Sequence, residues 1–103
     1  MTGRSPTSAE LTLQSFAPLV GEMFRVDLAV AGTLELELSE AGEGDAGPGS
    51  ERDPFRLLFR GPGEPVLAQR THRLEHPVLG ALEIFLVPVG RDARGTSYEA
   101  IFA

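Results

Sequence analysis

The sequence contains no cysteine, no tryptophan and no lysine. Without cysteine the chain forms no disulfide, no thiolate metal site and no thiolate nucleophile, so packing must supply its stability. The longest uninterrupted apolar run, from Ile84 to Val89, has six residues, whereas a membrane-spanning helix needs about 20. The opening residues, MTGRSPTSAE, also lack the apolar segment of a secretory signal peptide. These absences favour a soluble protein of the cytoplasm.

Motifs that name a reaction are missing as well, because no serine has a Gly-x-Ser-x-Gly context and no phosphate-binding loop is present. His72, Glu75 and His76 form the one cluster that resembles a ligand set or an acid–base pair. In an extended segment the two histidines share a face and offer a metal two ligands at most, without an identifiable third. We interpret His72 as a surface residue and His76 as a turn cap. We expect a protein that is not an enzyme and that has no catalytic residue, metal site or cofactor.

The net charge is −6, and the N-terminal half of the chain carries all of it. Residues 1–50 hold 2 arginines against 8 acids, whereas residues 51–103 hold 7 of each. An acidic chain repels phosphate groups at long range, which argues against nucleic acid and anionic membranes as partners. A stacking platform for nucleotides needs aromatic rings beside basic side chains, but Phe55 and Phe59 alternate away from the neighbouring arginines. We therefore expect no nucleic acid and no membrane among the partners.

Apolar and polar side chains alternate along much of the chain, which is the period of a half-buried β-strand. In one example Phe24, Val26, Leu28 and Val30 share a face. The segments with this pattern are 23–30, 33–39, 55–60, 71–75, 82–87 and 98–103. Residues 11–16 fit either a short strand or a helical turn. We expect an all-β fold, a small antiparallel barrel or sandwich of about six short strands, with a closed barrel as the first choice.

The length of the chain suits one domain. We expect residues 1–10 to be a disordered polar leader and residues 11–103 to be a single β domain. Within this domain, residues 41–54 are expected to form a mobile Gly-rich loop. The reason is that four glycines and one proline in residues 42–49 leave no apolar anchor to order the segment.

Charged residues on neighbouring strands suggest how two of the strands pair. If the strands pair antiparallel, Arg56 and Arg60 face Glu35 and Glu37, and each cross-strand pair contributes about 0.2–1 kcal/mol. These arginines then fix the register of the sheet. The alternative is a contact to an anion or to a partner's carboxylate.

The strand at 82–87 is apolar on both faces. Its even-numbered residues form one apolar face, and Phe85 and Val87 lie on the other face beside Glu83. Such a strand is either central and covered on both sides, or half core and half interface. The candidate interface residues are Leu58, Phe85, Val87, Ile101 and Arg73.

Four stretches of the sequence form a recognisable pattern. They are FAPLVGEMFRV (16–26), PFRLLFRGPG (54–63), LEHPVLGALEIFLVPVG (74–90) and YEAIFA (98–103). Together they resemble an uncharacterised family of short bacterial proteins that is known only as a domain of unknown function. The resemblance covers nearly all of the chain from Phe16 onward and implies no catalytic residue. Genes of such proteins often lie beside genes for phage-tail-collar-like proteins, so the resemblance implies a structural or assembly role.

These observations lead to two hypotheses of different kinds. The first is a non-enzymatic binding or assembly module, which docks on another protein such as a tail-fibre-like protein, or associates with itself. It would use a sheet edge or the second apolar face, formed by Phe85 and Val87. The second hypothesis is a barrel that holds a small apolar or anionic ligand in its interior, with Arg73 at the mouth. Because barrels of few strands fill their interior with their own side chains, a packed interior would contradict the second hypothesis.

Overall fold

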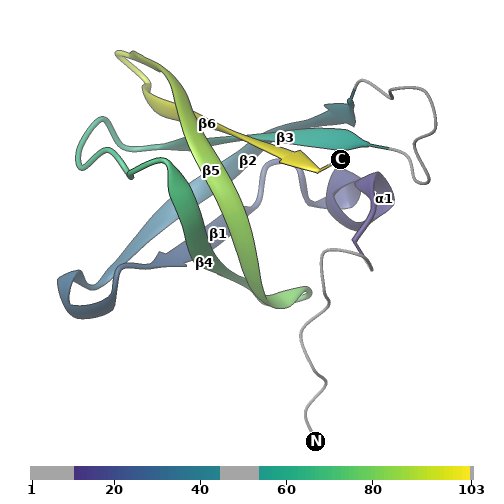
Figure 1. Ribbon diagram of the computed structural model, residues 1–103, viewed down its shortest axis with the longest axis horizontal. Coiled ribbons are helices and arrows are strands. Elements are labelled where there is room, and N and C mark those ends of the chain that lie inside the picture. The colour runs from purple at the N-terminus through teal and green to yellow at the C-terminus, as the bar shows by residue number, and fades with distance from the viewer. Residues whose placement is uncertain (1–10, 45–53, 103) are drawn as a thin grey trace, which may run out of the picture.

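The computed structural model describes residues 11–44 and 54–102, which form a closed barrel of six antiparallel strands in the order β1-β2-β3-β6-β5-β4 (Figure 1). The strands are β1 (Met23–Asp27), β2 (Thr33–Glu43), β3 (Phe55–Gly61), β4 (Arg70–His76), β5 (Gly80–Asp92) and β6 (Gly95–Phe102). The helical elements are α1 (Leu13–Phe16) and the 3-10 turns η2 (Ala17–Leu19) and η3 (Ala29–Ala31). The all-β class, the antiparallel pairing and the barrel that the sequence predicts are confirmed. The leader expected at 1–10 lies outside the described residues.

The alternation along each strand places one of its faces in the barrel interior. Along β3, Phe55, Leu57 and Phe59 are buried and the residues between them face outward. β6 repeats this alternation. The largest fully buried side chains are Tyr98, Phe16, Phe24, Phe55, Phe59, Leu36, Leu38, Leu57, Leu74, Ile84, Leu86 and Val26. These side chains fill the interior, as is usual for a barrel of few strands.

α1 packs into one end of the barrel. The ring of Phe16 is buried beside those of Phe24, Phe55 and Phe102, with centroids 6.3, 5.9 and 5.8 Å away. Figure 1 shows α1 beside the C-terminal end of β6. Residues 11–16, for which the sequence allows a strand or a helical turn, therefore supply a helical turn that covers the core.

The first strand ends three residues earlier than its alternation predicts, at Asp27 rather than at Val30. Asp27 Oδ1 accepts a hydrogen bond from the Ala29 amide at 2.8 Å, and Ala29 has a φ of 58°. The chain therefore turns into η3. Val30, predicted to point inward, is fully exposed. That prediction was wrong because a local bond from the carboxylate to the backbone competes with continuation of the strand.

The β2–β3 ladder confirms one of the two predicted charge pairings. Arg60 lies opposite Glu37, as predicted. Arg56 instead pairs with Glu99 on β6, with 3.4 Å between Nη1 and Oε2. The difference arises because the antiparallel register that puts Arg60 opposite Glu37 puts Arg56 at the other end of β2, opposite Gly42 and away from Glu35.

β2 extends further than the sequence predicts. Residues 41–43 pair with residues 55–57 of β3, and the Gly44 amide donates to the Pro54 carbonyl at 3.0 Å. The loop expected at 41–54 therefore begins later than predicted. Its residues 45–53 lie outside the described part of the chain.

The ladders that close the barrel differ in length. β3 and β6 pair over seven residues, whereas β1 and β4 pair only at Arg25–Glu75 and Val26–Leu74. We call this short β1–β4 contact the seam. The strand β5 is shared, because its first half pairs with β4 and its second half, from Val87, pairs with β6. Figure 1 shows β5 and β6 diverging away from their connecting turn.

Candidate functional site

Four apolar side chains form a patch on the outer wall of β3, β6 and β5. This surface, made of Leu58, Phe85, Val87 and Ile101, is called the outer patch. Leu58 and Val87 lie on either side of Glu99 in the central strand, because both are ladder partners of Glu99. Phe85 and Ile101 keep 50% and 60% of their surface exposed. The second apolar face of β5 is therefore directed outward, with Phe85 exposed and Val87 partly buried.

The outer patch surrounds one ion pair. Glu99 lies between Leu58 and Val87, and Arg56 lies opposite Ile101. The two charged side chains are partly exposed. Because each neutralises the other within the chain, a partner that covers the patch leaves no unpaired charge buried, and an unpaired buried charge is the costly arrangement.

Arg73, the fifth interface candidate, lies on β4, the strand that pairs with the Phe85 part of β5. It occupies the middle of β4, opposite Glu83 of β5, and its Nε is 3.6 Å from Glu75 Oε2. About half of each side chain in this ion pair is exposed, so the pair contributes little to stability. Arg73 shares the outward face of β4 with Thr71, the ladder partner of Phe85, and it lies in the middle of its strand rather than at a mouth of the barrel.

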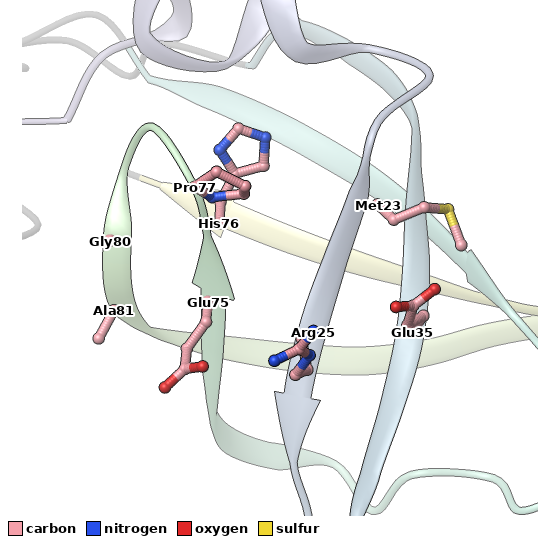
Figure 2. A pocket seen from close by; sticks show the side chains of 8 residues that line it. All are labelled: Met23, Arg25, Glu35, Glu75, His76, Pro77, Gly80 and Ala81. Carbon is pink, nitrogen blue, oxygen red and sulfur yellow. The ribbon is translucent and has the colours of Figure 1, made fainter.

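A pocket of about 530 Å³ lies on the outside of the barrel, where β1 and β4 separate beyond the seam (Figure 2). It is lined by Met23, Arg25, Glu35, Glu75, His76, Pro77, Gly80 and Ala81. Figure 2 shows Arg25 between the carboxylates of Glu35 and Glu75. These three residues are ladder partners on β2, β1 and β4. Glu35 was predicted to face an arginine of β3, and it faces Arg25 of β1 instead.

His76 borders the pocket and links β4 to the residues before β1. Its Nδ1 accepts a hydrogen bond from the Val78 amide at 3.0 Å. The ring proton therefore lies on Nε2, which donates to Glu22 Oε1 at 2.7 Å. The ring is buried and packs on Phe24, with centroids 4.6 Å apart. The turn-capping role predicted for His76 is confirmed, whereas Glu22 was missed because no sequence spacing connects two residues that lie 54 positions apart.

His72 was predicted to be a surface residue, and this prediction was wrong. It is buried, and its Nε2 donates to the Ala68 carbonyl at 2.8 Å. The reason is the alternation of β4, which puts His72 on the same inward face as Leu74 and His76. In residues 11–44 and 54–102, no group of three or more histidine or acidic side chains is placed to hold a metal ion.

The chain matches the family model of a domain of unknown function, DUF6916, over residues 11–102. The chain belongs to this family. The matched residues include every strand of the barrel and α1, so the sequence resemblance to a domain of unknown function is confirmed at the level of the family. Comparisons with curated proteins and with solved structures found no match. Within the described ranges, every helix is too short or too polar to cross a membrane.

Proposed function

We propose that this protein is a non-enzymatic binding or assembly module that docks through the outer patch on another protein chain, either a different protein or a second copy. The observation that carries the proposal is the exposure of Phe85 and Ile101 on a wall whose inward face is already packed. Full burial of a large apolar side chain contributes about 1.5–3 kcal/mol, and these two side chains gain it only when another surface covers them. Apolar side chains grouped on an outer surface are typical of contact sites between proteins.

Docking uses the outward face of the sheet rather than an edge strand. In the barrel each strand has a neighbour on both sides, so unpaired edges are limited to short stretches such as the part of β4 before Leu74, whereas strand addition depends on a long free edge. Of the two docking modes that the sequence suggests, the geometry supports the apolar face. Leu58 and Val87 extend this face across three adjacent strands.

A fibre-like protein of a phage-tail-like assembly is the first partner class to test. Its support is the sequence resemblance to bacterial proteins whose genes lie beside phage-tail-collar-like genes. The choice of surface is independent of that resemblance, since it rests on Phe85 and Ile101.

The alternative function, binding of a small ligand, has weaker support. The interior is filled by side chains such as Phe24, Phe59 and Tyr98. The pocket beyond the seam is large enough for a small molecule. However, Glu35 and Glu75 flank Arg25 there (Figure 2), and the two carboxylates disfavour an anionic ligand.

The test compares tagged wild-type protein with patch variants in extracts of the native host. Phe85→Glu and Ile101→Glu place a charge in the patch, and Val30→Glu places the same charge at a fully exposed site in η3. We expect the wild type and Val30→Glu to retain the same partner in fixed proportion and the two patch variants to lose it, while circular dichroism shows that all four remain folded. Equal retention by all four proteins, or recovery of an isolated wild-type monomer, would contradict the proposal.

A further inference from the structure

We infer that the occupant of the outer patch is a second copy of this chain, packed face to face about a two-fold axis. The inference rests on the proposed function, because it assigns a partner to the same surface. Its support is the arrangement of four outward residues on β3 and β6, together with the distribution of charge over the outer wall.

Four outward residues form a square on β3 and β6. Leu58 lies opposite Glu99, and Arg56 lies opposite Ile101. The two charged residues occupy one diagonal of the square, and the two apolar residues occupy the other. A two-fold axis along the apolar diagonal places Arg56 of each copy against Glu99 of the other. The same axis places Leu58 and Ile101 each against its own counterpart, so the square is self-complementary, as an isologous contact requires.

The existing ion pair favours this contact over an arbitrary apolar partner. In one copy, Arg56 Nη1 is 3.4 Å from Glu99 Oε2 and both side chains are partly exposed. In the dimer each of these charges gains a second opposite charge across the interface, where water is excluded and electrostatic attraction is stronger. A wholly apolar partner would remove water from the pair without supplying that compensation.

The distribution of charge also selects this wall for self-association. Two chains of net charge −6 repel each other, so copies approach most easily where acids are fewest. The outward charges of β3 and β6 are Arg56, Arg60 and Glu99, a net charge of +2 − 1 = +1. The outward charges of β1 and of the part of β2 that pairs with it are Arg25, Asp27, Glu35 and Glu37, a net charge of +1 − 3 = −2. Contact through β3 and β6 therefore brings together the less acidic walls.

The first measurement is the mass of the full chain by sedimentation equilibrium, from micromolar to millimolar concentration. We expect the mass to rise from 11.0 kDa toward 2 × 11.0 = 22.0 kDa. Phe85→Glu and Ile101→Glu are expected to weaken the dimer about tenfold or more, and Val30→Glu is expected to leave it unchanged. A mass that stays at 11.0 kDa, or equal weakening by all three variants, would overturn the inference.

A charge exchange tests the proposed two-fold geometry directly. Arg56→Glu alone gives a square with two acids, and Glu99→Arg alone gives a square with two arginines, so each variant should be monomeric by itself. When the two folded variants are mixed, each acid of one chain meets an arginine of the other, and we expect a heterodimer. A mixture that stays monomeric would refute the contact between Arg56 and Glu99.

The two proposals fail in different ways. If the wild type is monomeric at all concentrations but retains a different protein that the Phe85→Glu variant loses, the self-association inference is wrong and the proposed function stands. If the patch variants change neither the mass nor the retained proteins, both are wrong.

Discussion

Tyr98 places a polar atom in a largely apolar interior, where its hydroxyl holds a loop. Its hydroxyl accepts a hydrogen bond from the Leu67 amide at 2.8 Å, and both residues are buried. His72 fastens the same loop through the Ala68 carbonyl. The side chains of Tyr98 and His72 therefore position the segment between β3 and β4. Their hydrogen bonds to its backbone also satisfy polar atoms that are buried away from water.

The change Tyr98→Phe tests this role at the scale of one residue. It removes the acceptor of the buried Leu67 amide and leaves the ring in place, so we expect the free energy of unfolding to fall by about 1–3 kcal/mol. Urea titration measures the change. Hydrogen exchange should also become faster at Leu67 than at amides of the β3–β6 ladder. Unchanged stability together with unchanged exchange at Leu67 would show that the Tyr98 hydroxyl does not stabilise the loop.

At the scale of elements, the turn between β5 and β6 depends on a close approach to β3. Gly95 has a φ of +125°, and a Cβ added there would overlap the carbonyl oxygen of Gly61. Gly90, on β5 in the same hairpin, has open space around it. Gly95 therefore requires glycine both for its positive φ and for the close approach of Gly61, whereas Gly90 has room for a side chain.

The matched changes Gly95→Ala and Gly90→Ala test this difference. We expect Gly95→Ala to lower the free energy of unfolding by about 3 kcal/mol, because backbone strain and steric overlap add. For Gly90→Ala the expected change is less than about 1 kcal/mol. Thermal and urea unfolding measure both values, and similar costs at the two positions would contradict the close approach.

The sequence predicted strands well where apolar and polar residues alternate. It predicted poorly where a hydrogen bond, local or between distant residues, determines a strand end or a contact. The alternation of Phe55, Leu57 and Phe59 was sufficient to identify β3 and its buried face. Val30 was misassigned because the carboxylate of Asp27 ends its strand. The bond between His76 and Glu22 was not predictable, since only the closed barrel brings these distant residues together.

At the scale of the whole molecule, the barrel is closed unevenly. The seam contains two ladder pairs, whereas β3 and β6 share seven. A short ladder with a pocket beside it has few contacts to resist local opening. The same wall carries the pocket, whereas Leu58 and Ile101 lie on the seven-residue β3–β6 ladder on the opposite side of the barrel.

Hydrogen exchange of the native protein tests this unevenness. We expect amides at the seam, at Arg25 and Glu75, to exchange through local opening with a smaller free energy than those of the β3–β6 ladder, such as Leu57 and Tyr98. The slowest amides should report global unfolding. Equal protection at the seam and in the β3–β6 ladder would show that the short ladder does not weaken the closure.

The residues of the outer patch could be predicted from the sequence only in part. Phe85 and Val87 were identified because both faces of their strand are apolar, and Leu58 and Ile101 followed from the same alternation. The role of Glu99 within the patch was missed, since it depends on β6 lying between β3 and β5. Arg73 lies on β4, which pairs with β5, and it shares the outward face of β4 with Thr71, the ladder partner of Phe85.

The most direct test of the account is the capture experiment with light scattering on the eluted protein, comparing the wild type with Phe85→Glu. We expect the wild type to elute at a mass above the 11.0 kDa of one chain, in a complex that the folded Phe85→Glu variant fails to form. A wild type that elutes as a single chain, or a complex that survives Phe85→Glu unchanged, would contradict the claim that the outer patch is a protein-binding surface.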